Sequence, residues 1–99
     1  MDYLVTMTTH VPDGTSGAAV QDMRTREAAR SRELAAQGQL LRLWRPPLQP
    51  DEWRTLGLFV AVDGAQLETV LDSMPLRGWR TDEVTPLSPH PSDPARTSG

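Results

Sequence analysis

The 99-residue chain contains no cysteine and no lysine, and its hydrophobic runs are short. Without cysteine it forms no disulfide, no thiolate nucleophile and no cysteine-ligated metal site. Without lysine it cannot make a Schiff base with a carbonyl substrate. A transmembrane helix needs about 20 apolar residues in succession, and no segment supplies them, so we expect no membrane as a partner. Proton transfer is left to Asp, Glu, two histidines and one tyrosine.

The charged residues are ten arginines and thirteen acids, which give a formal net charge of −3. The arginines are spread along the sequence without a basic block, which argues against nucleic acid as a partner. The guanidinium of arginine presents paired N–H donors that suit a carboxylate ligand. It also stays protonated, so it is a poor group for proton transfer. Residues 1–9 show neither the basic start nor the cleavage pattern of an export signal, which predicts a cytoplasmic location.

The sequence also lacks the short motifs of several enzyme classes. It contains no G-x-S-x-G, no G-x-G-x-x-G and no P-loop, which argues against serine hydrolases and nucleotide-binding enzymes. His10 and His90 lie near opposite ends of the chain, with no second histidine or cysteine beside either one. A zinc site is therefore not expected.

Hydrophobic patterning predicts four strands and two helices. The segment from 17 to 37 is rich in Ala, Arg, Glu and Gln, with Ser16 as a possible N-cap and Gly38 in the position of a C-cap glycine. Alternating or β-rich stretches predict strands at 3–9, 39–45, 53–62 and 79–85, and a second helix is expected at 65–73. The resulting β-α-β-β-α-β order is that of the ferredoxin-like plait, an α+β fold.

The strand at 39–45 bears on assembly. Alternation places Leu41 and Leu43 on one face and Leu40 and Trp44 on the other. Helices cover only one face of a sheet in a two-layer domain, so apolar groups on both faces predict a partner on the open face. We expect a homodimer of the dimeric α/β barrel type, which also compensates for the small core of a chain this short.

The C-terminal end has a different composition. It is rich in Pro, Ser and Asp and has too few apolar groups to fold alone. We expect residues 1–91 to form a single ferredoxin-like domain with a C-terminal arm, and residues 92–99 to form a flexible tail. By composition alone, His90 would be an exposed residue in this end.

Glu27 is the candidate for acid–base chemistry. It lies in the middle of the inward stripe of the first helix, which runs through Val20, Met23, Ser31 and Leu34. A carboxylate facing a sheet must be paired, hydrogen-bonded or protonated, and such a group can act as a general base or acid. The structural alternative is an ion pair with Arg24, Arg30 or an arginine of the sheet.

The second strand supplies candidates for substrate binding. Arg42 and Arg45 straddle Leu43 and Trp44, and an arginine directed at the helix layer could hold a substrate carboxylate or neutralise Glu27. The three tryptophans, at positions 44, 53 and 79, could serve the core or form the wall of a pocket for a flat organic ligand.

These residues together suggest a family. The sequence resembles muconolactone Δ-isomerase and its relatives, including the chloromuconolactone dehalogenases. The resemblance covers nearly the whole chain and is carried by the run from Glu27 to Gly38, the following QLLRLWR strand, Met74-Pro75-Leu76, Glu83-Val84, Leu87 and His90-Pro91.

The resemblance implies a ferredoxin-like fold, pairing into α/β barrels and assembly into decamers. It implies a cofactor-independent isomerase of aromatic catabolism, which shifts an allylic proton in a small unsaturated lactone that bears a carboxylate, or a lyase that eliminates HX from a related lactone. Glu27 matches the family's first-helix glutamate as the acid–base candidate. Trp44 and Arg45 match its Leu-Trp-Arg strand and His90 its His-Pro ending, and with Arg42 and Trp79 they are the expected substrate-binding residues.

The sequence departs from the family pattern in three places. Ala28 replaces the lysine that commonly follows the helix glutamate, the loop at 46–53 is longer, and Arg77-Gly78 replaces the usual aromatic residues after Pro-Leu. These differences keep two alternatives open. One is a cyclase, dehydratase or cofactor-free oxygenase for a larger aromatic or polyketide-like molecule, and the other is a non-catalytic barrel protein. A cavity near the lower end of the usual range of about 300 to 1,000 Å³, with an arginine at its end, would favour the lactone.

Overall fold

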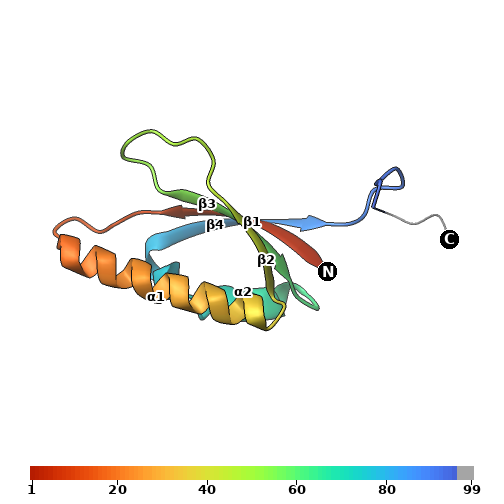
Figure 1. The fold of residues 1–99 in the computed structure, drawn as a ribbon, viewed down its shortest axis with the longest axis horizontal. Coiled ribbons are helices and arrows are strands. Elements are labelled where there is room, and N and C mark those ends of the chain that lie inside the picture. Colours follow the sequence, from red (N-terminus) through yellow and green to blue (C-terminus); the bar gives the residue numbers. More distant parts are fainter. Residues whose placement is uncertain (96–99) are drawn as a thin grey trace.

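The computed structural model describes residues 1–95 of the chain. Its elements follow the predicted order, and Figure 1 shows them along the chain. They are β1 (Asp2–Thr9), α1 (Gly17–Ala36), β2 (Leu40–Trp44), β3 (Arg54–Val60), α2 (Gly64–Asp72), the short 3-10 helix η1 (Pro75–Trp79) and β4 (Arg80–Leu87). Trp53 and Trp79, which we expected on strands, lie one residue before β3 and at the end of η1.

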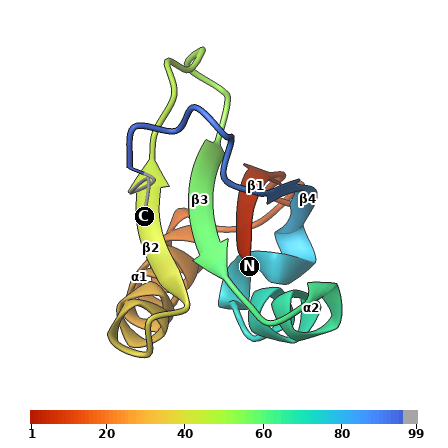
Figure 2. The same cartoon turned by 90° about the vertical axis from the view of Figure 1, so that its right-hand side faces the viewer.

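The four strands form one antiparallel sheet in the order β2-β3-β1-β4. Both helices lie on the same side of it, with α1 towards β2, as Figures 1 and 2 show. This arrangement is the predicted ferredoxin-like plait. Within residues 1–95, neither helix has the combination of length and apolar character that crossing a membrane requires.

The first helix begins and ends where the sequence predicts. The Ser16 hydroxyl accepts a hydrogen bond of 3.1 Å from the amide of Ala19, and Gly38 has a φ of +75°, a conformation that glycine adopts without a Cβ clash. The predicted inward stripe is confirmed: Leu34 is fully buried, and Glu27 and Ser31 are half-buried on the same face. The helix therefore presents polar side chains to the sheet in its middle and an apolar one near its C-terminus.

The core lies between the sheet on one side and α2 and the C-terminal half of α1 on the other. Alternate residues of β1 are buried, and Phe59 of β3 is completely inaccessible to solvent. Gly57 leaves room for this ring, because a Cβ there would lie 2.7 Å from a Phe59 ring carbon. The buried core cluster consists of Tyr3, Val5, Met7, Leu34, Leu40, Phe59, Ala61, Leu67, Val70, Leu71 and Met74.

The predicted alternation along β2 is wrong. The pairing with β3 shifts between Leu40 and Arg42, which leaves Leu41 as an extra residue. One extra residue reverses the facing of everything after it. Leu43 therefore lies opposite Gly57 on the helix side, whereas Trp44 lies opposite Leu56 on the outer face.

The end of the chain leaves the body of the domain. β4 runs to Leu87, two residues further than expected, and tolerates Pro86 because it is an edge strand that needs fewer backbone donors. Residues 88–95 then project as an arm away from the sheet (Figure 1). The flexible tail predicted at 92–99 lies partly outside the described residues, which end at 95.

Candidate active site

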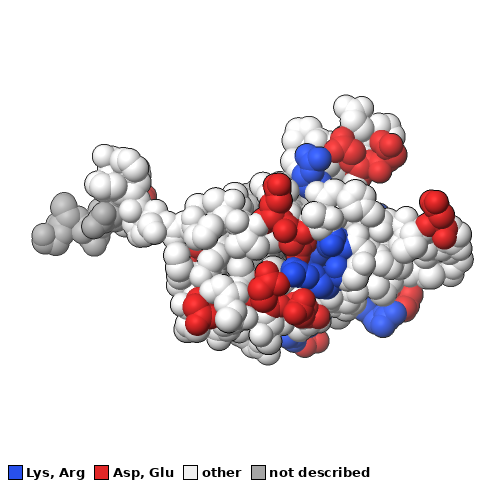
Figure 3. All heavy atoms as spheres, turned by 180° about the vertical axis from the view of Figure 1, so that it is seen from behind, with Lys and Arg blue, Asp and Glu red and all other residues white. Residues whose placement is uncertain are grey.

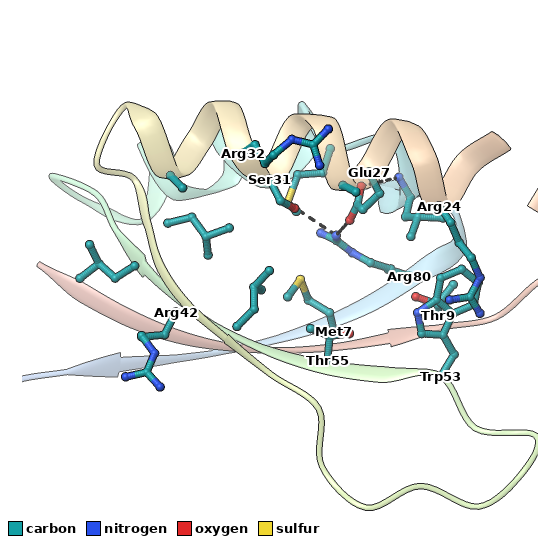
Figure 4. Close-up of a pocket in the computed structure, with 17 residues that line it drawn as sticks. Met7, Thr9, Arg24, Glu27, Ser31, Arg32, Arg42, Trp53, Thr55 and Arg80 are labelled. Carbon is teal, nitrogen blue, oxygen red and sulfur yellow. Dashed lines mark hydrogen bonds and ion pairs between the residues drawn. The ribbon is translucent and has the colours of Figure 1, made fainter. Parts of the chain in front are cut away.

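A partly open cavity of about 480 Å³ lies between α1 and the sheet. The sheet side of its wall combines apolar side chains, such as Leu40 and Leu43, with polar ones, such as Thr55, and the side of α1 is mainly polar (Figure 4). Ala28, where the resemblance would lead one to expect a lysine, also lines it. A small side chain at this position leaves space in the cavity that a lysine would fill.

Glu27 reaches into this cavity from the middle of α1. Its side chain is 15% exposed, and Oε2 accepts a hydrogen bond of 2.7 Å from Nη1 of Arg80. Oε1 accepts a bond of 3.1 Å from the amide of Leu76, at the start of η1. Both carboxylate oxygens are thus oriented by groups that lie about fifty residues further along the chain. The ion pair with an arginine of the sheet, which the sequence offered as the structural alternative, does form. It lies at the wall of the cavity.

Arg80 is the most buried charged side chain of the site. It is 1% exposed, and its Nε and Nη2 bind Asp82 at 3.0 and 2.8 Å. The side chain of Asp82 is itself only 3% exposed. The two residues lie two positions apart on β4 and so share its helix-facing side, opposite Thr9 and Met7 of β1. This two-pronged contact holds the guanidinium in one orientation, with Nη1 directed at Glu27.

Arg77 supports this pair from the other side. Its Nη1 lies 2.6 Å from Asp82 Oδ2, and its other nitrogens bind Glu68 at 2.6 Å and Asp72 at 3.3 Å. Figure 3 shows the result at the surface, where basic side chains lie among acidic ones. The ion pairs therefore form a connected group that runs from the outside of α2 to Glu27 at the cavity.

A second arginine lies at one end of the cavity. The Cζ atom of Arg24, one turn before Glu27 on α1, lies 3.9 Å from the centroid of the Trp53 ring (Figure 4). The backbone of Trp53 is tied to β1, because its carbonyl accepts a 2.8 Å bond from the amide of Thr9. Thr9, with 8% exposure, also lines the cavity.

The structure brings only part of the predicted site together. Glu27 and Arg42 both line the cavity, but the guanidinium of Arg42 points away from α1, towards Trp44 on the outer face (Figure 4). Trp44, Arg45 and Trp79 do not line it. His90 lies in the arm, beside a separate groove, where its Nδ1 accepts a bond from the amide of Ser92.

Sequence reasoning missed Arg80, Asp82 and the pairing of Arg24 with Trp53. The alternation of Arg80, Asp82 and Val84 on one strand face was a usable signal, because two opposite charges on the inner face of a strand must pair to be buried. Nothing local indicates that Arg24 meets Trp53. Among residues 1–95 no cluster of His, Asp and Glu is arranged to hold a metal ion.

Comparison with known proteins identifies the family. A family model described as muconolactone delta-isomerase matches residues 1–93. The muconolactone Delta-isomerase of Cupriavidus pinatubonensis is 32% identical over 92 residues, which are 93% of this chain and 97% of that protein. Muconolactone Delta-isomerase 1 of Acinetobacter lwoffii is 30% identical and covers 93% of each chain. A crystal structure of muconolactone isomerase has the same fold, with a TM-score of 0.86, 24% identity and 98% coverage of each chain. The chain therefore belongs to the muconolactone delta-isomerase family.

Proposed function

We propose that this protein is an isomerase that converts muconolactone without a cofactor, with Glu27 as the group that moves the proton. The observation that carries the proposal is the position of Glu27, a carboxylate fixed at both oxygens on the wall of a cavity that would hold a small ligand. The membership of this chain in the muconolactone delta-isomerase family supports the same reaction.

The reaction needs one base and one stabiliser of negative charge. The base removes the proton from the ring carbon next to the conjugated double bond, and the electron pair spreads through the ring to the carbonyl oxygen as a dienolate. The same proton is then returned to the other end of the allylic system, so the base is regenerated and nothing is oxidised. Glu27 supplies the base in this scheme. When it takes up the proton it loses its negative charge, so the positive charge of its partner Arg80, which also lines the cavity, can then stabilise the reacting anion.

Size favours a small substrate over a larger one. The cavity volume of about 480 Å³ lies in the lower part of the range of ligand sites, about 300 to 1,000 Å³. A long cavity lined by tryptophans would have favoured a polyketide-like molecule, but Trp53 is the only tryptophan lining this one within residues 1–95. A non-catalytic barrel protein would be favoured by a closed salt bridge with no space beside it, whereas Glu27 borders open space.

The test is turnover of muconolactone, followed by the change in ultraviolet absorbance as the conjugation of the ring changes. Glu27→Gln should lower turnover by roughly 10² to 10⁴, the usual effect of losing a general base, and should leave folding intact. Glu33→Gln is the matched control, because Glu33 lies on the same helix with its side chain 60% exposed and ion-paired to Arg30. Unchanged turnover in Glu27→Gln would remove this residue from the mechanism. Chloromuconolactone, assayed in parallel, separates isomerisation from elimination.

We further propose that two copies pair through the outer face of the sheet. This face carries Leu4, Leu56 and Leu58 beside Trp44, which is 40% exposed. Leu56 pairs with Thr6 and Trp44, which places these groups on one continuous surface. Apolar side chains side by side on a sheet face favour burial against a second copy. The decamer remains the expectation from the family resemblance.

We propose that the arm contributes to the same assembly. Residues 88–95 project from the domain, and the prolines at 89 and 91 restrict the free chain, which lowers the entropy lost when it docks on a neighbouring subunit. His90 would then reach a partner's cavity rather than its own. Residues 1–91 as one domain, a tail at 92–99 and a cytoplasmic location also stay predictions, and proteolysis and cell fractionation would test them.

A further inference from the structure

Four arginines line the cavity, and they differ in what else they bind. Arg80 is committed to Glu27 and Asp82. Arg42 turns away from α1, with its Cζ atom 5.1 Å from the centroid of the Trp44 ring. Arg32 lies along the helix in Figure 4 rather than across the cavity. The remaining arginine is Arg24, whose side chain extends from α1 to the sheet side at one end of the cavity (Figure 4).

Within residues 1–95, the contact that holds Arg24 is with an aromatic ring and leaves its hydrogen-bond donors unused. Its guanidinium lies over the ring of Trp53 at 3.9 Å, and none of the ion pairs formed within residues 1–95 includes it. A cation–π contact uses the face of the guanidinium, whereas the N–H groups point outward in its plane. The stack therefore orients a planar set of donors that suits the two oxygens of a carboxylate.

The charges around Glu27 make a further cation necessary for an acidic ligand. The ion-paired group to which Glu27 belongs contains four carboxylates, Glu27 included, but only two arginines. A substrate that carries its own carboxylate would meet net negative charge there unless another group offset it. Arg24 lies three residues before Glu27, so the two side chains are neighbours on one face of α1, with their Cβ atoms about 5 to 6 Å apart. A carboxylate on Arg24 would leave the rest of a small molecule beside Glu27.

We propose that Arg24, stacked on Trp53, binds the carboxylate of the substrate and thereby selects acidic lactones over neutral ones. The identity of the ligand rests on the function proposed above. The assignment differs from the sequence-based expectation, which gave this role to arginines of the second strand, Arg42 and Arg45. Arg24 acts by binding and orientation, and it takes no part in moving the proton.

The experiment is a calorimetric titration with the saturated lactone acid that corresponds to muconolactone, and with its methyl ester. The saturated acid has no double bond to shift, so binding is measured without turnover. Arg24→Gln should weaken binding of the acid about 10- to 100-fold, the usual loss when a hydrogen-bonded charge pair is removed, and should leave binding of the ester unchanged. Arg24→Lys keeps the charge but loses the planar donors, so it should restore only part of the affinity.

Arg26→Gln is the matched control, because Arg26 lies on the same helix, does not line the cavity and is 60% exposed in an ion pair with Asp22. It should bind acid and ester as the unaltered protein does. Equal binding of the acid by the unaltered protein and Arg24→Gln would overturn the proposal, and so would no binding of the acid by the unaltered protein. Arg24-dependent binding of the acid without any turnover of muconolactone would instead overturn the proposed reaction and leave this binding site standing.

Discussion

Asp82 offers the sharpest test of how the site is held together. Its carboxylate, 3% exposed, accepts bonds of 3.0 and 2.8 Å from Arg80 and one of 2.6 Å from Arg77. Asp82→Asn keeps the size of the side chain but removes the charge and replaces one acceptor oxygen with a donor NH₂ group. That group would face a guanidinium, which has no acceptor.

Removing one partner of a buried ion pair costs about 3 to 5 kcal/mol. Because Arg80 keeps Glu27 as a partner, and Arg77 keeps Glu68 and Asp72, we take the lower end, about 3 kcal/mol. In a domain of this size, each kcal/mol of lost stability lowers the melting temperature by about 4 to 8 °C. A loss of about 3 kcal/mol therefore predicts a melting temperature lower by about 12 to 24 °C. Stabilities of small domains are about 5 to 15 kcal/mol, so the variant should still fold at low temperature.

Urea unfolding followed by tryptophan fluorescence measures the stability, and turnover at low temperature measures the effect on the site. Because Arg80 would be less firmly oriented, we expect the folded Asp82→Asn variant to have a lower kcat. Glu83→Gln is the control, because this neighbour is exposed and lies on the outer face. A triple variant, Glu27→Gln with Arg80→Met and Asp82→Leu, should lose less stability than Asp82→Asn, since it leaves no buried charge of this network unpaired. A loss under about 1 kcal/mol in Asp82→Asn, or an equal loss in Glu83→Gln, would refute this account of the network.

Two further predictions concern assembly. Light scattering of the unaltered protein should give at least a dimer. Leu58→Glu, which puts a charge on the outer face of the sheet, should shift the protein towards the monomer. An unaltered protein that is monomeric at micromolar concentration would contradict the proposed pairing into an α/β barrel. Truncation after Leu87 should weaken assembly and turnover together while secondary structure measured by circular dichroism is kept. A truncated protein with full assembly and activity would show that His90 and the arm serve neither.

The sequence was sufficient where local chemistry decides the structure. Ser16 and Gly38 set the ends of α1, because capping depends on residues within one turn of the helix end. The spacing of apolar residues placed Glu27 on the inward face, since helical periodicity needs no knowledge of the rest of the fold. The order of the elements and the family resemblance then led to the ferredoxin-like plait, which the structure confirms.

Only the tertiary structure decided what Glu27 meets. Its partner, Arg80, comes from a strand 53 residues further along, and neither periodicity nor propensity measures distance between elements. One extra residue in β2 turned Trp44 to the outer face, because a bulge shifts the phase of a two-residue repeat and cannot be located from alternation alone. The contact of Arg24 with Trp53 likewise depends on how the long loop after β2 returns to the sheet. Local sequence therefore determined which side chains face inward, whereas strand register and chain return determined which of them share the cavity.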